Sequence, residues 1–486
     1  MQMIGGQDQK EGQKTKKILK ISLIVLIILF VIVLAAVIIL SFSSPKSLRV
    51  VRDQVQVSAS NDLVMIDNQT GRIYISIEDF VKMKNAKGQT DYAYQKGEYK
   101  SNTGNTEDST KGYIESKDEV ATFSLASDRI YKTPPGTEPD YEYFTIDTPV
   151  RSINGKLYMS PEGISIATNC KVKYNQEKNV LTVQSLTYLI ESYKTKYTTA
   201  GYSGIGEEFD NAKALLYDMV IVNREGKYGV LSTLDDSTII GTKYDRINFV
   251  EDTKEFFVTM NSKTGSLSTT GATQISLTYD EIKTLDSDSK LYVVSSNGKK
   301  GVVDQKGRII VHLEYDKIGI DSNTFPVNKI KNGMFLYDNC IPVQQGERCG
   351  VFNKAGELIV PLEYTRFGYL GSTTKDKIVN NLLLVPQIEG IIVCKDNKYG
   401  IVHSTGRVLA PAMFDKIYSV TNAGQDEYFI EYEGNTMKMA DFIKANNITV
   451  VDNAANIENI NQNEINGATT NTQQDPGQAV QNNVQQ

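Results

Sequence analysis

The sequence of 486 residues has no tryptophan, only two histidines (His312 and His403) and only four cysteines, none of them in a CxxC motif. These shortages leave little for zinc or copper sites or for histidine-based catalysis. So few cysteines in a long chain fit an exported protein that does not depend on disulfides, and sequence leaves open whether any two are bridged. The four are Cys170, Cys340, Cys349 and Cys394. We predict no catalytic, metal-binding or cofactor-binding residues.

An excess of positive charge is also lacking, since the formal net charge is −6 and the pI is near 5.4. That balance argues against a nucleic-acid partner, which requires a clustered basic face. Tyrosine, by contrast, is abundant, with 27 residues against 16 phenylalanines. Tyrosine and β-branched residues favour half-buried strands, so the composition predicts a mainly β fold. As an alternative, the tyrosines form a stacking surface for sugars or partners.

One long apolar run stands near the start of the chain. Residues 21–42 carry no charge and are interrupted only by Ser22 and Ser41. As a helix this run reaches about 33 Å, which is enough to cross the hydrocarbon core of a membrane. The run is longer than the roughly 7–15 apolar residues of a cleaved signal peptide, so we predict an uncleaved transmembrane signal-anchor. Cleavage near Ser41-Phe42-Ser43 is the alternative.

The charges beside this run predict its orientation. Five lysines precede it, whereas Lys46, Arg49 and Arg52 follow it. The larger basic cluster stays in the cytoplasm. We therefore expect residues 1–20 to be a cytoplasmic tail and the rest to lie outside, on a single-pass plasma membrane protein.

Residues 50–190 read as a small α+β domain. A strand at 143–146 is followed by a hairpin centred on Asn154-Gly155, a helix that begins at Ser160-Pro161, and a closing hairpin over 170–183. A weaker copy of the same order runs through residues 63–83. The polar stretch 84–117 between the copies predicts a loop insertion.

This order resembles the copper amine oxidase N-terminal-like domain, a module common in exported bacterial proteins. The resemblance is carried by Ile153-Asn154-Gly155-Lys156, by the Ser-Pro helix start, and by Val180-Leu181-Thr182-Val183. It implies an α+β fold and no copper site, and the segment contains no histidine. Residues 191–218 then predict a helical linker.

A repeat array follows over residues 219–445. A valine stands seven residues before each of five marker glycines. Each of the last four marker glycines is followed by another glycine six residues later and by an aromatic residue fourteen residues later, and the first repeat fits with one extra residue, at Tyr244. The aromatic residue usually opens a Tyr-Asp-x-Ile phrase. Such coincidences indicate five repeats. The five glycines are Gly229, Gly265, Gly301, Gly350 and Gly400.

The sequence of each repeat predicts three strands. One repeat alone would expose an apolar edge, so neighbouring repeats are expected to stack on it. Gly307, for example, is expected in a tight turn before the third strand. The array is predicted to be propeller-like or a solenoid, and the sequence leaves that choice open. Longer gaps hold insertions at 321–339 and 369–387, which we expect to project on one side.

These phrases resemble the WG-type (Trp-Gly) repeat family, whose unit reads Gly-Lys-Trp-Gly-hydrophobic, Gly, a hydrophobic pair, Pro, then Tyr-Asp. The resemblance covers nearly all of residues 220–420 and implies an interaction function without catalytic residues. His312 occupies the slot of Pro361 and Pro411, so we interpret it as a strand-edge residue. The tryptophan slot departs from the family and holds Tyr228, Thr264, Lys300, Cys349 and Tyr399.

After the fifth repeat come a weak sixth unit at 431–435 and a helix at 439–445, an atypical end that caps the array. Residues 446–486 are rich in Asn and Gln and contain no Lys or Arg. This composition predicts a disordered tail.

Motifs with chemistry are scarce. Gly204-Ile205-Gly206 lacks the third glycine of a phosphate loop, and Asp286-Ser287-Asp288 lacks the Gly and Glu of a calcium loop. Glu207, Glu208 and Asp210 precede a helical stretch, where acidic residues answer the helix dipole.

Three functions remain open. The first is a non-enzymatic cell-envelope binding or scaffold protein, whose repeats face a protein or a cell-wall polymer. The second is a wall-acting hydrolase that uses carboxylates from the insertions. The third is a one-span sensor, against which the short cytoplasmic tail counts. We favour the first.

Overall fold

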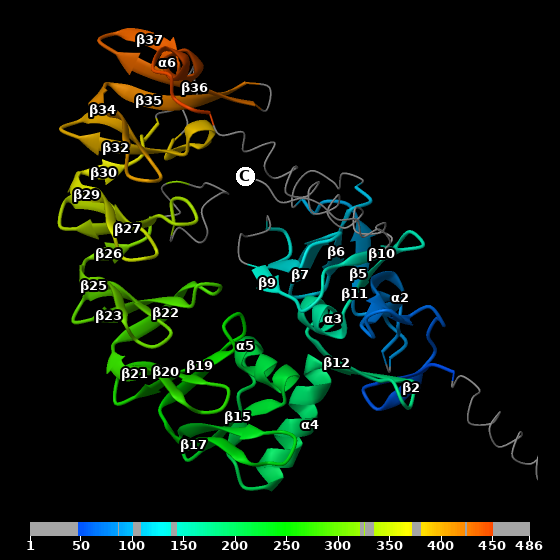
Figure 1. Ribbon diagram of the computed structural model, residues 1–486. Coiled ribbons are helices and arrows are strands. Elements are labelled where there is room, and N and C mark those ends of the chain that lie inside the picture. The colour runs from blue at the N-terminus through cyan, green and yellow to red at the C-terminus, as the bar shows by residue number, and fades with distance from the viewer. Residues whose placement is uncertain are drawn as a thin grey trace, which may run out of the picture. The chain divides into compact units, whose positions relative to one another are not determined.

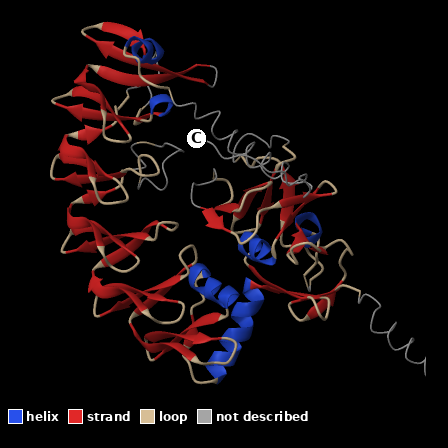
Figure 2. Ribbon diagram, in the orientation of Figure 1, coloured by secondary structure: helices blue, strands red, loops and turns tan. Residues whose placement is uncertain are grey.

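The computed structural model describes residues 47–85, 87–100, 108–137, 143–320, 325, 335–371, 381–422 and 425–450. It is mainly β, as Figure 2 shows. No helix in these ranges is both long and apolar enough to cross a membrane. The predicted anchor at 21–42, the tail before it and residues 451–486 lie outside the described ranges. The described residues divide into two units by their contacts, 47–49 with 174–181, and those between 50 and 173 with those between 182 and 450.

Three antiparallel sheets and two short helices, α2 (Ile77–Val81) and α3 (Pro161–Thr168), form the first part of the chain. The first sheet has the order β12-β13-β1-β2, with bounds Cys170–Asn175, Val180–Ser185, Arg49–Arg52 and Val55–Val57. The second has the order β10-β11-β4-β3, with bounds Arg151–Ile153, Lys156–Met159, Ile73–Ser76 and Val64–Ile66. The third runs β5 to β9 in chain order, with bounds Ala93–Lys96, Lys111–Glu115, Val120–Ser124, Arg129–Thr133 and Tyr143–Thr145.

Local chemistry explains these elements. Asn154 and Gly155 both have positive φ, which the two-residue turn between β10 and β11 requires. The Ser160 hydroxyl accepts a hydrogen bond from the Gly163 N–H and caps α3, and Ser76 caps α2 in the same way. The strands and helices predicted for both copies are therefore confirmed as elements.

The predicted loop insertion at 84–117 is wrong in part. It contains β5 and β6, which pair with each other, and β6 pairs in turn with β7. Few residues in this stretch are apolar, so hydrophobic alternation did not reveal the strands. Tyr113 and Ile114 of β6 are nevertheless buried, because a single apolar pair suffices where neighbouring strands supply the rest of the core.

Helices lie at both ends of the predicted linker. Helix α4 (Leu186–Thr199) begins after its N-cap Ser185. Helix α5 (Phe209–Ala212) and the 3₁₀ helix η1 (Lys213–Tyr217) follow. The short strand β14 (Gly204–Ile205) lies between α4 and α5 and is the first strand of the next sheet. Gly204-Ile205 is thus part of a sheet and no phosphate loop.

In the part of the array that the structure describes, the strands form six sheets. The first sheet contains β14 to β17, and the bounds of β15, β16 and β17 are Met219–Arg224, Lys227–Ser232 and Thr238–Tyr244. The second contains β18 to β21, with bounds Arg246–Val250, Glu255–Met260, Lys263–Ser268 and Thr273–Tyr279. The third sheet contains β22 to β25, with bounds Glu281–Asp286, Leu291–Ser296, Lys299–Asp304 and Ile309–Tyr315. The fourth contains β26 to β29, with bounds Lys317–Ile318, Ile341–Gln345, Arg348–Phe352 and Leu358–Tyr364. The fifth sheet contains β30, β32, β33 and β34, with bounds Arg366–Phe367, Gly390–Lys395, Lys398–His403 and Val408–Phe414, and β31 (Leu384–Val385) pairs with β32. The sixth contains β35 to β37, with bounds Lys416–Asn422, Gln425–Tyr432 and Asn435–Lys438.

The prediction of three strands per repeat is wrong by one strand. The first five sheets each have an additional strand before these three. In the first sheet this strand is β14 from the linker, and in the next four it comes from the Tyr-Asp-x-Ile phrase, or its Tyr-Thr-Arg-Phe equivalent, of the repeat before. The Asp280 N–H, for example, donates to the Ser295 carbonyl at 2.8 Å, which starts the pairing of β22 with β23. Ile282 then lies buried in that sheet. The phrase that ends one repeat therefore begins the sheet of the next.

Consecutive sheets contact each other in chain order, as for β20 with β22 and β21 with β23. Figure 1 shows the succession from β15 to β37. Within the described ranges, no contact of similar extent joins the first sheet of the array to the last. Apolar side chains fill the spaces between neighbouring sheets.

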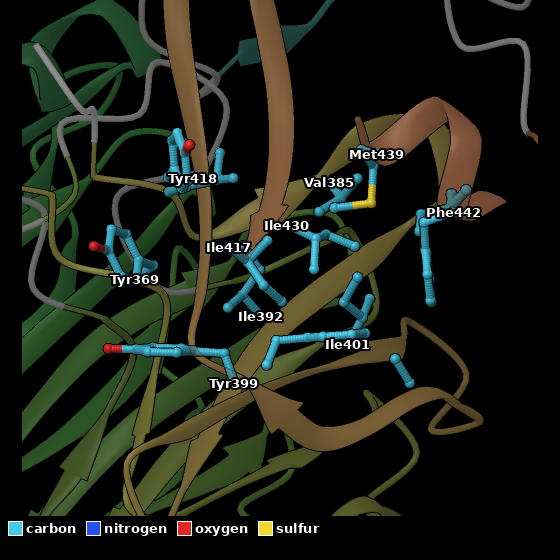
Figure 3. Packing of buried hydrophobic residues seen from close by; sticks show 14 of the residues in the cluster. Tyr369, Val385, Ile392, Tyr399, Ile401, Ile417, Tyr418, Ile430, Met439 and Phe442 are labelled. Atoms are coloured by element: carbon cyan, nitrogen blue, oxygen red, sulfur yellow. The ribbon is translucent and has the colours of Figure 1, made fainter. Parts of the chain in front are cut away.

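The end of the array has its own core, shown in Figure 3. Helix α6 (Met439–Ala445) has the predicted bounds and buries Met439, Phe442 and Ile443. These side chains belong to one cluster with Ile430 of β36 and Ile401 of β33. The helix covers apolar surface that a further sheet would otherwise bury, as expected for an array end.

Candidate binding surface

The five glycines that mark the repeats are required by close packing. In each repeat the glycine lies opposite a bulge of the following strand, and a Cβ there would lie 2.6–2.8 Å from a backbone carbonyl oxygen of that strand. For Gly301 the oxygen is that of Val311. Real Cβ atoms do not approach this closely, so only glycine fits.

The second glycine lies close to the preceding repeat in three of the four repeats that have one. Gly271 has φ +81°, and a Cβ on it would overlap the carbonyl oxygen of Ile239 in the preceding sheet. Gly356 and Gly406 lie against Ile310 and Ile359 in the same way. The turn before the last strand therefore nests on the last strand of the neighbouring sheet.

An aspartate connects each sheet to the next at four of five joints. Asp280 pairs with Lys263 of its own repeat at 2.7 Å and accepts a hydrogen bond of 2.8 Å from the Asn297 N–H of the next. We call this arrangement the joint clamp. The other clamp aspartates are Asp245, Asp316 and Asp415, paired with Lys227, Lys299 and Lys398. In each, the lysine hydrogen bond and then the backbone N–H lower the pKa of the carboxyl group.

The joint after the fourth repeat departs from this scheme. Thr365 replaces the aspartate, and Arg348 replaces the lysine. The Thr365 hydroxyl donates to the Cys394 carbonyl at 3.1 Å, and Arg348 donates to the Glu363 carbonyl at 2.6 Å. Backbone hydrogen bonding is retained there without a charged clamp.

Both histidines have places in the repeat scheme. His403 stands three residues after Gly400, and its Nδ1 accepts a hydrogen bond of 3.1 Å from the Thr405 N–H. Asp304 and Asn353 cap the same turn in the third and fourth repeats. His312 is exposed on β25, the last strand of its sheet, which agrees with its interpretation as a strand-edge residue.

Exposed apolar side chains recur at one repeat position. Ile309, Leu358 and Val408 each open the last strand of their sheets, and they are 51%, 45% and 53% exposed. Thr238 and Thr273 hold this position in the first two repeats and are also exposed. We call these five residues the edge row. Gly271, Gly356 and Gly406 lie against Ile239, Ile310 and Ile359, the residues that directly follow Thr238, Ile309 and Leu358. These row positions therefore lie beside the turn of the next repeat.

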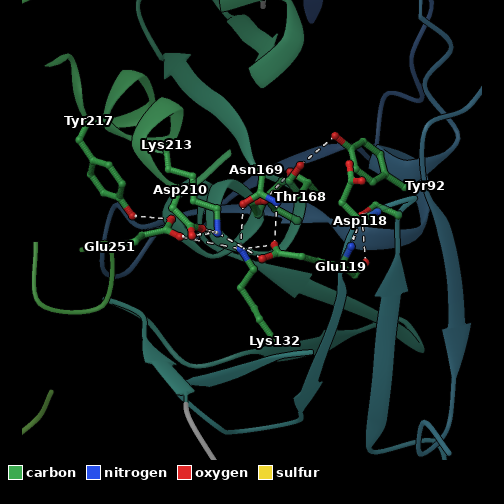
Figure 4. Close-up of polar contacts among 12 residues, drawn as sticks. Tyr92, Asp118, Glu119, Lys132, Thr168, Asn169, Asp210, Lys213, Tyr217 and Glu251 are labelled. Carbon is green, nitrogen blue, oxygen red and sulfur yellow. Dashed lines mark hydrogen bonds and ion pairs between the residues drawn. The ribbon is translucent and has the colours of Figure 1, made fainter. Parts of the chain in front are cut away.

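A buried ion cluster, which the sequence did not indicate, lies elsewhere in the same unit (Figure 4). Glu119 pairs with Lys132 at 2.6 Å and with Lys213 at 3.1 Å, and Lys213 lies 3.2 Å from Glu251. Both lysines and Glu251 are almost fully buried. Asn169 donates to Glu119, and Tyr217 donates to Glu251. The cluster joins β8 and the start of β7 to η1 and to the end of β18.

The pKa shifts of Glu119 and Lys213 show that the glutamates and lysines of the cluster stabilise each other's charged forms. Burial alone raises the pKa of Glu119, but Lys132 and Lys213 outweigh burial and lower it. Burial lowers the pKa of Lys132, whereas Glu251 and Glu119 raise the pKa of Lys213 against burial. Two lysines and two glutamates balance in charge. This geometry supports structure and offers no group free to exchange a proton.

Other acidic residues considered in the sequence are dispersed. Glu207 pairs with Lys194, whereas Asp286 pairs with the distant Lys354. Within the described residues, no three His, Cys, Asp or Glu side chains are grouped as a metal site would require. All four cysteines are buried and free, which answers the question about bridges.

The family comparison bears directly on this repeat scheme. Residues 301–329 match the WG containing repeat. The match starts at Gly301, the marker glycine of the third repeat, and supports a WG-repeat protein. It covers a small part of the chain. No curated protein matches the chain.

Solved structures give distant matches. A eukaryotic initiation factor matches with 10% identity and a TM-score of 0.24 over 77% of this chain and 83% of that chain. PorZ, a bacterial surface component of the type-IX secretion system of Porphyromonas gingivalis, matches with 9% identity and a TM-score of 0.16 over 72% and 39%. Hsv2 of Kluyveromyces lactis matches with 6% identity and a TM-score of 0.20 over 70% and 92%. Scores this low say nothing about what a WG-repeat array of this kind does.

Proposed function

We propose that the chain is a binding or scaffold protein of the cell envelope and that its WG-type array presents a surface to a partner protein or a wall polymer. The edge row carries this proposal. Isolated exposed apolar residues are ordinary on a protein surface, but Ile309, Leu358 and Val408 recur at one position in three successive repeats. Packing within the array does not require apolar side chains there, since Thr238 and Thr273 stand at the same position in the first two repeats.

In the same proposal the array is an open stack of sheets that lies outside the cytoplasm, and one membrane span at 21–42 anchors it. Its support is the uncharged run and the five lysines before it. The copper amine oxidase N-terminal-like module would lie between membrane and array. Protease added to intact cells, with their outer layers permeabilised, should then digest the array. Digestion only after membrane lysis would contradict this placement.

The test of function is co-sedimentation of the full chain, in detergent micelles, with protein-free cell-wall sacculi over a salt series. Retention that survives salt would identify the wall polymer as the partner, because screened charge contacts would be lost. Absence of retention would direct the search to proteins cross-linked to the array in the native membrane. If neither sacculi nor a specific cross-linked protein is found, the proposal is wrong.

A further inference from the structure

The third repeat contains a pocket of about 350 Å³, near the lower end of the roughly 300–1,000 Å³ typical of small-ligand sites. It lies over the β22–β24 part of its sheet. Its lining residues are Glu281, Lys283, Thr284, Val293, Ser295, Lys300 and Ile318. Val293 and Ile318 are buried and apolar, whereas the other five carry polar groups. Lys300 occupies the tryptophan slot of the WG-type repeat.

The fifth repeat shows what fills this place elsewhere in the same chain. Strand pairing is equivalent in the two sheets, since Glu281 pairs with Ser295 as Arg366 pairs with Cys394. By this register Lys300 corresponds to Tyr399. Counted along the chain from the same pair, Thr284 corresponds to Tyr369, which lies just after β30 and forms a bridge with Leu382. The residue after Ile318 is Gly319, and its counterpart is Tyr418.

In the fifth repeat those three tyrosines pack together. The rings of Tyr369 and Tyr399 lie 5.1 Å apart, those of Tyr369 and Tyr418 lie 6.3 Å apart, and all three residues are buried (Figure 3). The Arg366 guanidinium lies 5.5 Å from the centre of the Tyr399 ring. The third repeat has Thr, Lys and Gly at the corresponding sequence positions. The place of the Tyr399 ring, which strand pairing assigns to Lys300, is therefore part of an open pocket in the third repeat.

The charge of the pocket adds a preference. Lys283 is paired with Glu281 at 3.0 Å. No hydrogen bond or ion pair of the Lys300 ammonium is found among the described residues. An aromatic ring in the pocket would contact the apolar side chains of Val293 and Ile318 and lie near the Lys300 ammonium. A carboxylate beside the ring would pair with Lys300.

We propose that this pocket receives an aromatic side chain, flanked by carboxylates, from an extended segment of a partner protein. The proposal rests on the proposed binding function and names the chemistry of one contact. Buried aromatic anchors seated in pockets commonly dominate the energy of such interfaces.

The first test fills the pocket. Because the chain has no tryptophan, the K300W variant carries a single indole whose emission reports its surroundings. We expect emission shifted to shorter wavelength and a raised unfolding midpoint. The E314W variant places the indole on an exposed position of β25 in the same sheet and should emit as solvated indole. Equal emission from both variants would show that the pocket does not hold a ring.

The second test adds a probe to the full chain in micelles, with binding followed by saturation-transfer NMR. The peptide acetyl-Glu-Trp-Glu-amide should bind about tenfold more tightly than acetyl-Lys-Trp-Lys-amide, a difference the pairing with Lys300 predicts. K300W should abolish binding, and K300T should weaken it while leaving the pocket open. Equal binding of the two peptides, or unchanged binding to K300W, would overturn the inference. Retention on sacculi is measured independently, so failure here is distinguishable from failure of the proposed function.

Discussion

At the scale of single residues, the repeat is defined by places where no side chain fits. Gly301 and its four equivalents face a carbonyl oxygen across a bulge. The sequence marked these glycines by their spacing, but the spacing alone did not tell which contact required them.

We predict that Gly301→Ala destabilises the chain by about 2–4 kcal/mol, because its Cβ would lie 2.6 Å from the Val311 oxygen and the strands would have to separate. Gly241→Ala is the matched control, since nothing lies within 4 Å of a Cβ there. Urea unfolding of both variants measures the difference. Equal midpoints would show that the bulge tolerates a side chain.

The cysteines make a second prediction at this scale. Burial raises the pKa of Cys340 to about 12, and burial also raises the pKa values of Cys170 and Cys349. A thiolate is the reactive form. The native chain should therefore react slowly with a thiol reagent at about pH 8, whereas four thiols should react after unfolding in denaturant. Rapid labelling of the native chain would contradict their burial.

At the scale of elements, the sequence predicted most strands, the start of α3 and both ends of α6. It failed where pairing partners lie far along the chain. β5 and β6 have too few apolar residues to show alternation. The fourth strand of the second to fifth sheets of the array belongs by sequence to the preceding repeat, and that of the first sheet belongs to the linker. The clamp aspartates were visible in the Tyr-Asp phrase, but their lysine partners lie 17 or 18 residues earlier and became evident only in the fold.

The joint clamps predict a pH dependence. A carboxylate whose pKa is lowered on folding stabilises the fold above its ordinary pKa, and this contribution is lost as pH falls through the lowered folded value. Asp280→Asn should therefore lower the urea midpoint at neutral pH, and its difference from the wild type should shrink below about pH 4. Glu225→Gln, at an exposed turn without a clamp, is the control. A difference that is independent of pH would contradict the clamp.

At the scale of the whole molecule, the buried ion cluster ties elements far apart in the sequence into one unit. The sequence could not have indicated it, because Glu119, Lys132, Lys213 and Glu251 are separated by long stretches and follow no motif. Removal of one member leaves the remaining buried charges unbalanced.

We expect Lys213→Met to destabilise the fold by about 3 kcal/mol, because Glu119 and Glu251 then lose their shared cation. A variant that also carries Glu119→Gln should lose less than the sum of the two single changes. Thermal unfolding of the single and double variants measures this coupling. Additive losses would show that the pairs act independently.

The identity of the partner is the part of the function that sequence and fold leave to experiment. The repeat position of the edge row was present in the sequence, yet Ile309, Leu358 and Val408 looked there like ordinary strand residues. Their exposure became evident only when the last strand of each sheet was placed at its edge.

The most direct measurement is partner capture by the full chain in its native membrane, with the triple change Ile309→Glu, Leu358→Glu and Val408→Glu. These side chains are exposed, so the fold should persist while the apolar row becomes acidic. We predict that the partner cross-linked to the wild type, or retention on sacculi, falls at least about tenfold. Leu234→Glu, at a 73% exposed leucine outside the row, should leave capture unchanged. Undiminished capture by the triple variant would contradict the edge row as the binding surface.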